Sequence, residues 1–230
     1  MLPSRLRPPQ PLLELVRRDG LLRQLSADTT PLVVVSAPAG SGKTVALAQW
    51  AASDGRPFAW LQADAADNDP LVLLGYLVSA LGSVMDVDPM VANWLQLAPP
   101  PVATRIVPAL AAAIGVAAPF VLVVDDAHLV TNEACWQLIG VLLEQVSPGA
   151  QLCLSGRAAP PLSLPRLRTA GRLREVGPPE LALTPNETHK LLRLHGVAAD
   201  AETVAYLSRV TEGWAAGLYL AALAARQRPA

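Results

Sequence analysis

The chain has 230 residues, of which 52% are apolar, and its formal net charge is −1. This length and composition allow a sizeable core and argue against disorder, while the small net charge and the lack of long single-sign runs give no electrostatic reason to expect binding to nucleic acid or an anionic membrane. The apolar stretch 107–124 resembles a membrane span, but Pro108, Gly115 and Pro119 interrupt it, and a helix followed by a buried strand fits better.

The N-terminal two thirds of the chain alternate apolar runs with helical patterns. Residues 12–25 (LLELVRRDGLLRQL) predict a short amphipathic helix, followed by a turn at 27–31. Continuous apolar runs bounded by turn residues are typical of strands buried on both faces. The predicted strands are 32–37, 58–64, 119–128, 150–157 and, more weakly, 173–177. Because helical segments separate them, we expect a doubly wound α/β fold with a parallel five-stranded sheet.

From Glu180 onward the pattern becomes entirely helical. Thr184, Pro185 and Glu187 form a capping-box helix start, and the remaining residues look helical up to Arg226. We therefore divide the chain into an N-terminal segment (1–30), a sheet domain (31–178) and a small helical domain (179–230). The absence of further closing structure after Ala230 leads us to expect that the chain is part of a longer protein.

A phosphate-binding loop is the most specific motif in the chain. Residues 37–44 read APAGSGKT, which matches the P-loop pattern except that Ala37 replaces the first glycine. The loop follows a predicted buried strand and opens a predicted helix, whose N-terminus favours an anion. The chain has sixteen arginines but only two lysines, and one of these is Lys43, whose compact ammonium fits between phosphate oxygens. The residues expected to bind the phosphates here are Ala37, Pro38, Ala39, Gly40, Ser41, Gly42, Lys43, Thr44 and Val45.

Two acids and an arginine follow the third and fourth predicted strands. Asp125 and Asp126 come directly after an apolar run, at the sheet edge where open α/β sheets bind ligands. We expect Asp125 and Thr44 to hold Mg²⁺ and Asp126 to orient the attacking water, with Lys43 assisting catalysis. Arg157 is expected to sense the γ-phosphate, because in the ASCE type of P-loop NTPase the fourth strand lies between the first and third. His128 either contacts the γ-phosphate region or packs beside the acids.

The two cysteines and the first residues of the chain indicate the cellular compartment. Cys135 and Cys153 lie in apolar surroundings without metal-type spacing, which predicts buried thiols in a reducing compartment. The first residues have prolines and arginines but no continuous apolar run of a signal peptide. We expect a cytoplasmic protein.

In its motifs, the sequence resembles the MalT-like branch of the STAND signalling ATPases, large regulators that often end in a LuxR-type helix-turn-helix. The resemblance extends over nearly the whole chain. The features that narrow it to this branch are Asp67-Asn68-Asp69-Pro70, the stretch from Arg157 to Arg168, and Glu212-Gly213-Trp214 followed by Gly217. One departure is Tyr219, which follows Gly217-Leu218 where many relatives have a proline, so that no proline contact to the nucleotide is expected.

The resemblance implies roles that the residues alone do not give. It implies that Val16 and Arg18 lie near the adenine and that the helices after Glu180 form a lid over the nucleotide. It also implies ATP as the ligand, self-association of the full regulator, and DNA binding only through a helix-turn-helix that this chain lacks. We expect an ATP- and Mg²⁺-dependent switch with slow hydrolysis. A P-loop kinase for a small molecule and an inactive nucleotide-binding interaction module remain alternatives.

Overall fold

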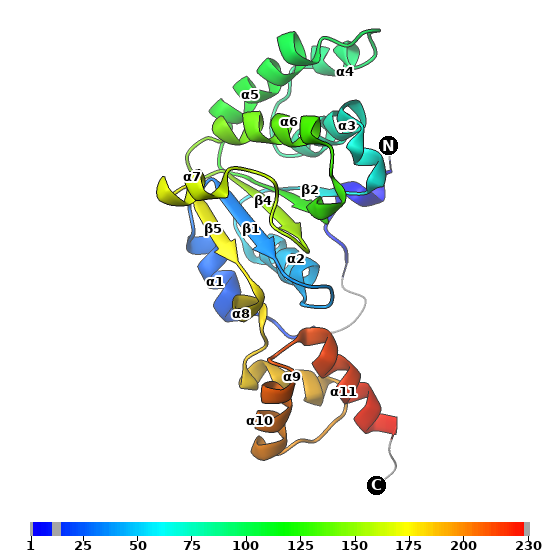
Figure 1. Ribbon diagram of the computed structural model, residues 1–230, viewed down its shortest axis with the longest axis vertical. Helices are drawn as coiled ribbons and strands as arrows, with labels where there is room; N and C mark the ends of the chain where they lie inside the picture. Colours follow the sequence, from blue (N-terminus) through cyan, green and yellow to red (C-terminus); the bar gives the residue numbers. More distant parts are fainter. Residues whose placement is uncertain (1, 11–14, 228–230) are drawn as a thin grey trace.

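Five parallel strands form one open sheet at the centre of the protein, as seen in a computed structural model that describes residues 2–10 and 15–227 (Figure 1). The strand order is β2-β3-β4-β1-β5, and every neighbouring pair is parallel. The strands are β1 (Leu32–Ser36), β2 (Phe58–Gln62), β3 (Val121–Asp125), β4 (Gln151–Gly156) and β5 (Leu173–Val176). This confirms the predicted α/β class, including β4 between β1 and β3.

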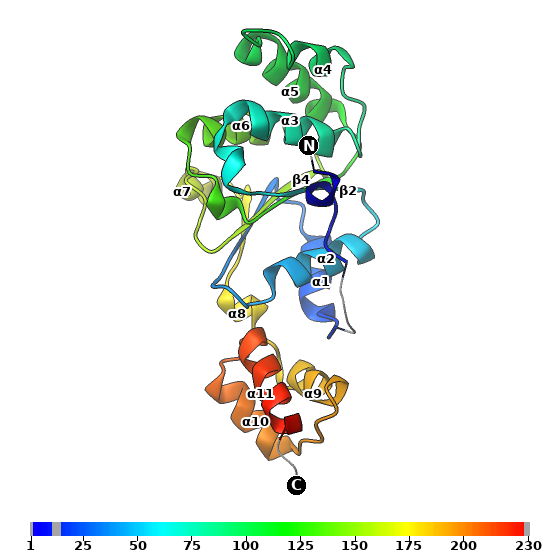
Figure 2. The ribbon, with the colours of Figure 1, turned by 90° about the vertical axis from the view of Figure 1, so that its right-hand side faces the viewer.

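Helices cover both faces of the sheet, as the continuous apolar strands predict (Figures 1 and 2). Side chains alternate along β1, so that Val33 and Val35 pack with α1 (Asp19–Ala27) and α2 (Lys43–Ser53). Leu32 and Val34 point to the opposite layer. That layer includes α3 (Pro70–Leu81), α5 (Val107–Val116), α6 (Glu133–Glu144) and α7 (Leu164–Thr169).

Short helical turns connect the main elements. The structure has 3₁₀ turns η1 (Pro3–Leu6), η2 (Ala65–Asn68) and η4 (Ala127–Leu129), a π-helical turn η3 (Val102–Ile106), and the short helices α4 (Met90–Trp94) and α8 (Pro178–Leu181). The stretch 107–124 forms α5 and then β3, as predicted. Within the described residues, no helix combines the length and apolar character needed to cross a membrane. Both cysteines are buried as free thiols, which confirms this part of the prediction, whereas the reducing compartment stays a prediction.

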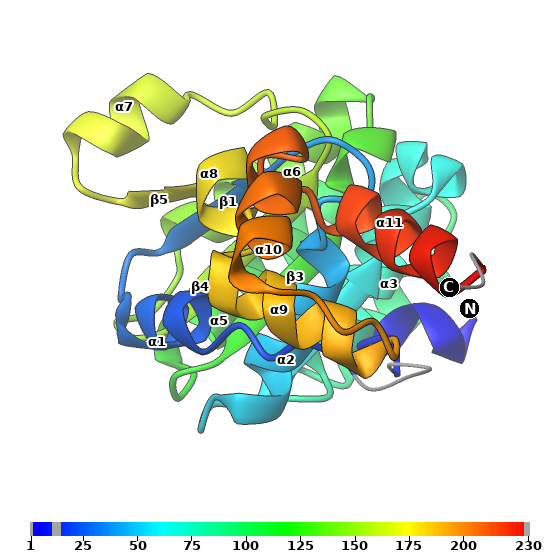
Figure 3. The same cartoon turned by 90° about the horizontal axis from the view of Figure 1, so that it is seen from below.

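The C-terminal helices form a separate small core below the carboxyl edge of the sheet (Figures 1 and 3). They are α9 (Pro185–Leu194), α10 (Ala201–Val210) and α11 (Ala215–Gln227). Leu192, Val204 and Leu218 are among the residues of this core. The predicted capping box is present, since Thr184 Oγ1 accepts from the Glu187 N–H at 3.3 Å and Glu187 Oε2 accepts from the Thr184 N–H at 2.9 Å. We call residues 183–227 the helical unit.

The predicted helix at 12–25 is wrong at its start, because α1 begins only at Asp19. Residues 11–14 lie outside the described part of the chain. Just before α1, the backbone is held by a side chain of α2 instead of by helical hydrogen bonds. Gln49 Oε1 accepts from the Arg18 N–H at 3.1 Å, and Gln49 Nε2 donates to the Val16 carbonyl at 2.9 Å. The residues 16–18 are therefore docked against α2 in a non-helical conformation.

Candidate functional site

The loop between β1 and α2, residues 37–42, turns through two left-handed glycines. Gly40 has φ 75° and Gly42 has φ 82°, values that residues with a Cβ rarely adopt. The N–H groups of these glycines have no acceptor in the part of the chain that the structure describes. Gly42 is also the N-cap of α2, so the unpaired donors lie at the positive end of a helix dipole. This arrangement favours a bound anion.

The carbonyl groups at 37–40 in the same loop all have donors. Lys43 Nζ donates to the carbonyl oxygens of Ala37 at 2.7 Å and Pro38 at 3.0 Å. The carbonyls of Ala39 and Gly40 accept hydrogen bonds from the helical unit. Because these acceptors are satisfied while the two glycine donors are free, the loop is suited to a ligand with negative charge and not to a cation.

Lys43 is the first residue of α2 and is only 8% exposed. Burial lowers the pKa of Lys43, while the negative charges of Asp125 and Asp126 act in the opposite direction and Arg157 lowers it further. The lysine, both acids and the arginine all lie at or after the carboxyl ends of the neighbouring strands β1, β3 and β4, so they lie at one edge of the sheet. The structure thus brings together residues that are up to 114 positions apart in the sequence.

Thr44 and Asp125 form the side-chain pair expected of a magnesium site. Thr44 Oγ1 donates to Asp125 Oδ2 at 2.6 Å, and Asp125 is completely buried at the end of β3. A hydroxyl and a carboxylate are the hard oxygen ligands that Mg²⁺ prefers, and this ion usually completes its shell with water and substrate phosphates. The residues present therefore fit a nucleotide-bound Mg²⁺. Among the described residues, no group of three or more His, Cys, Asp or Glu is placed to hold a metal ion.

Asp126 follows β3 in a left-handed conformation, with φ 53°. Its Oδ2 accepts a hydrogen bond of 2.6 Å from Gln62 Nε2, at the end of β2. The Asp126 side chain is 37% exposed, so it remains accessible to water at the edge of the sheet. Sequence reasoning did not identify Gln62, although its place at the carboxyl end of a predicted strand was a usable signal. His128 Nδ1 lies 3.9 Å from Asp126 Oδ1, beyond hydrogen-bond distance, and His128 packs against Gly156.

Arg157 follows the last residue of β4 and is exposed. Within residues 2–10 and 15–227 it has no ion-pair or hydrogen-bond partner. Because β4 lies between β1 and β3, Arg157 emerges between the loop 37–42 and Asp125. Its guanidinium is therefore available to an anion at this edge.

Val16 and Arg18 lie between the sheet domain and the helical unit. Val16 packs against the core of the helical unit. Arg18 is 5% exposed, donates to the carbonyls of 180–182 at 2.8 to 3.3 Å, and forms an ion pair of 3.2 Å with Glu187. The guanidinium thus ties the N-terminal segment to the start of the helical unit, and its resemblance-based role near the adenine stays a prediction.

The helical unit contacts the phosphate-binding loop directly. Trp214 Nε1 donates to the Ala39 carbonyl at 3.1 Å, and the N–H of Ala216 in α11 donates to the Gly40 carbonyl at 3.0 Å. Figure 3 shows these helices in front of the sheet domain, viewed from the end at which the loop lies. Both bonds use carbonyl groups, which leaves the N–H groups of Gly40 and Gly42 unpaired. The segment 212–217 had been singled out only by its family resemblance, and the structure gives it a contact with the loop.

Replacing Gly40 with alanine is expected to lower the free energy of unfolding through backbone strain and through a steric clash. The clash should contribute about 1 to 3 kcal/mol beyond the strain. The added Cβ would lie 2.6 Å from Ala216 Cβ, which forces α11 away from the loop. Gly171→Ala is the matched control, since its φ of +65° is similar and nothing lies within 4 Å of the added Cβ. Urea unfolding measures both variants. Equal losses would mean that α11 does not rest on the loop in solution.

Comparison with protein families gives a match over residues 14–155 to the AAA ATPase domain. Among curated proteins, the chain is similar to the HTH-type transcriptional regulator MalT of Serratia proteamaculans, with 32% identity over 99% of this chain and 25% of the regulator. The corresponding MalT of Yersinia enterocolitica is 32% identical over 99% of this chain and 26% of its own length. The chain therefore spans about a quarter of the curated relatives that it matches.

Two solved structures share the fold. One is a signal transduction ATPase with numerous domains (STAND) and a tetratricopeptide repeat sensor, from Pyrococcus horikoshii, with a TM-score of 0.59, 16% identity, and coverage of 90% of this chain and 29% of the other. The other is a Walker-type ATPase of Pyrococcus abyssi, with a TM-score of 0.54, 15% identity, and coverage of 94% and 69%. At these identities the likeness concerns the fold alone.

Proposed function

Because this chain belongs to the AAA ATPase domain family, we propose that it is the nucleotide-binding switch module of a MalT-like transcriptional regulator, and that it binds ATP with Mg²⁺ and hydrolyses it slowly. The observation that carries the proposal is the hydrogen bond of 2.6 Å between Thr44 and Asp125, beside the free N–H groups of the loop. This arrangement supports a phosphate-binding loop next to a pair of side chains that could hold Mg²⁺.

The proposed roles follow from the chemistry of each group. The backbone at 37–42, with Lys43 and Val45, binds the phosphates, and the Lys43 ammonium exchanges its carbonyl partners for phosphate oxygens. Thr44 would hold Mg²⁺ directly and Asp125 would hold it directly or through water, and the bound ion would supply positive charge against the phosphates. Asp126 orients the attacking water with the oxygen that Gln62 leaves free, and Arg157 stabilises charge at the γ-phosphate.

The switch depends on different affinities for ATP in two arrangements of the chain. A ligand shifts a conformational equilibrium only through such a difference. The γ-phosphate contacts of Lys43 and Arg157 would supply it, and the bonds from Trp214 and Ala216 to the loop would pass the change to the helical unit. In this proposal, ADP favours the closed resting form, and ATP orders or exposes surfaces for self-association of the full regulator.

The proposed module has three parts. Residues 1–30 form the segment near the adenine, with Val16 and Arg18 as its contacts, residues 31–178 form the ATPase domain, and residues 179–230 form the lid. DNA binding belongs to a helix-turn-helix outside this chain, no membrane partner is proposed, and the protein acts in the cytoplasm.

A thermal-shift experiment with ATP, ADP and GTP, each with Mg²⁺, tests nucleotide binding. At a hundredfold excess over Kd, linkage predicts that a true ligand raises the free energy of unfolding by about 2.7 kcal/mol. We expect this increase with ATP and ADP but not with GTP, and AMP serves as the control that lacks the β- and γ-phosphates. Unchanged stability with both ATP and ADP would remove the basis of the proposal. Fast transfer to a phosphoacceptor would favour a kinase, and retention of ATP without phosphate release would favour an inactive binding module.

A further inference from the structure

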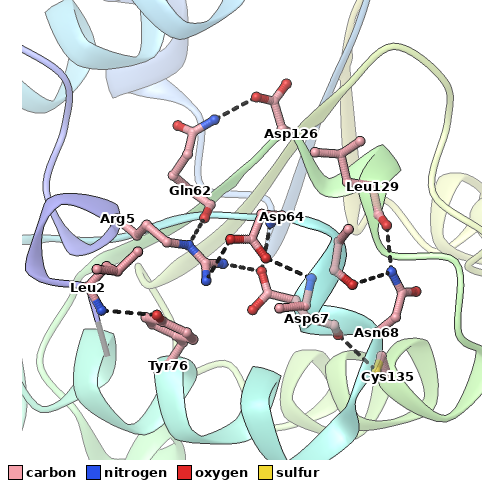
Figure 4. Close-up of polar contacts among 12 residues, drawn as sticks. Leu2, Arg5, Gln62, Asp64, Asp67, Asn68, Tyr76, Asp126, Leu129 and Cys135 are labelled. Atoms are coloured by element: carbon pink, nitrogen blue, oxygen red, sulfur yellow. Dashed lines mark hydrogen bonds and ion pairs between the residues drawn. The ribbon is translucent and has the colours of Figure 1, made fainter.

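The N-terminal turn η1 is fastened to the edge of the sheet through one buried arginine. Arg5 is only 8% exposed, and its Nε donates to the Gln62 carbonyl at 2.8 Å (Figure 4). Its two terminal nitrogens form ion pairs with Asp64, at 3.1 Å, and with the fully buried Asp67. The guanidinium carbon also lies 4.0 Å from the centre of the Tyr76 ring. A planar fork of this kind holds several acceptors in one fixed geometry.

Of the three polar partners of Arg5, Gln62 is the last residue of β2, and Asp64 and Asp67 belong to the turn between β2 and α3. Within this turn, Asp64 and Asp67 form a capping box that starts η2. Asn68, the last residue of η2, reaches across to the segment after Asp126 (Figure 4). Its Nδ2 donates to the Leu129 carbonyl at 2.9 Å, and its Oδ1 accepts from the Thr131 N–H at 2.6 Å. The Asn132 N–H donates to the same Oδ1 at 2.9 Å.

Asp126 is therefore held from two directions, by the last residue of β2 and by a residue of the turn that follows β2. Gln62 binds its carboxylate at 2.6 Å, and Asn68 binds the backbone three to six positions further along. The left-handed φ of 53° at Asp126 is uncommon for a residue other than glycine, although aspartate adopts it more readily than most, and the contacts from Gln62 and Asn68 support it here. The Asp67-Asn68 pair, which the sequence resemblance singled out without a role, is part of this support.

We infer that Arg5 is a positioning residue for the proposed hydrolysis, which sets the Asp126 carboxylate through Gln62. The inference rests on the proposed function of Asp126. The path has two hydrogen bonds: Arg5 Nε fixes the backbone of Gln62, and the Gln62 side chain fixes the carboxylate. Since small displacements of a catalytic group lower rates steeply, the loss of this support affects turnover more than ATP affinity. The N-terminal residues 2–6 thus belong functionally to the site, although Arg5 lies 57 positions before Gln62 in the sequence.

A double-mutant cycle with Arg5→Gln and Gln62→Ala tests the path by steady-state phosphate release at varied ATP concentration. We expect each variant to lower kcat roughly tenfold while the KM for ATP changes less than about twofold. If Arg5 acts through Gln62, Arg5→Gln causes no further loss in a chain that already has Gln62→Ala. Arg7→Gln is the control, because Arg7 is exposed in the same segment and should leave kcat unchanged. Additive losses, or equal changes in kcat and KM, would overturn the inference.

Amide hydrogen exchange separates this inference from the proposed hydrolysis. In Arg5→Gln without nucleotide, we expect faster exchange across residues 126–132 and unchanged exchange in the central part of α6. If the wild-type chain releases no phosphate, the hydrolysis proposal fails, and the exchange measurement still decides whether Arg5 holds the turn. Unchanged exchange across 126–132 would contradict the positioning role.

Discussion

Lys43→Ala is expected to raise the Kd for ATP roughly a hundredfold, which corresponds to about 3 kcal/mol. The lysine is buried at the mouth of α2, and burial already lowers the pKa of its ammonium. Phosphate oxygens would replace the neutral carbonyl acceptors of this buried cation with charged ones, and charge-assisted hydrogen bonds are stronger than neutral ones. The loss should be larger for ATP than for ADP, because the γ-phosphate is one of the groups that the ammonium reaches. Isothermal titration calorimetry with Mg²⁺ measures both affinities.

The only other lysine of the chain provides the control. Lys190 lies exposed on α9, so Lys190→Ala removes the same charge from the protein without changing the loop. Lys43→Ala also leaves the carbonyls of Ala37 and Pro38 without their donor, so urea unfolding must show that the variant still folds. Wild-type affinity in a folded Lys43→Ala protein would count decisively against a phosphate site at this loop.

The strands of this protein could be predicted because a strand buried on both faces needs a short, continuous apolar run bounded by turn residues. The order of β4 between β1 and β3 followed from the class of NTPase and not from any local signal. The start of α1 could not be predicted in the same way. Residues 12–25 have a helical pattern, but at 16–18 Gln49 offers the backbone alternative hydrogen bonds from 31 to 33 positions away, and the helix begins after them.

In the candidate site, too, residues with local contacts could be predicted from the sequence, and residues with distant contacts could not. The loop at 37–44 is contiguous in sequence, and its two glycines have the positive φ values that a tight turn of this kind favours. Arg5 had no visible signal, because a lone arginine in a proline-rich segment normally lies in solvent. Its burial depends on ion pairs with Asp64 and Asp67. These two acids come close to Arg5 only when η1 lies along the edge of β2. Trp214 likewise reaches Ala39 across 175 positions.

Trp214 and Ala216 contact the loop at groups other than those that would bind phosphate. The bonds from Trp214 and Ala216 stabilise the carbonyl side of the loop, while phosphate would bind its N–H side. Ligand and helical unit therefore do not compete for the same hydrogen-bonding groups, and the backbone of the loop can respond to both. A shift of Gly40 on phosphate binding would displace Ala216, because the two residues are tightly packed. A Cβ added at Gly40 would lie only 2.6 Å from the Cβ of Ala216.

Asp126→Asn is expected to keep Mg²⁺-ATP binding within about twofold and to lower the rate of phosphate release by roughly two to four orders of magnitude. Asparagine tolerates the left-handed backbone at this position, and its carbonyl can still accept the hydrogen bond from Gln62, so the turn should keep its structure. What is lost is the negative charge that orients and activates water, whereas the magnesium pair of Thr44 and Asp125 is untouched. Single-turnover phosphate release and calorimetric binding of Mg²⁺-ATP measure the two effects separately, and Asp86→Asn, an exposed acid in the loop after α3, is the control. Hydrolysis at the wild-type rate would exclude Asp126 as the water-orienting acid, while a loss of Mg²⁺-ATP affinity would instead make it a metal ligand.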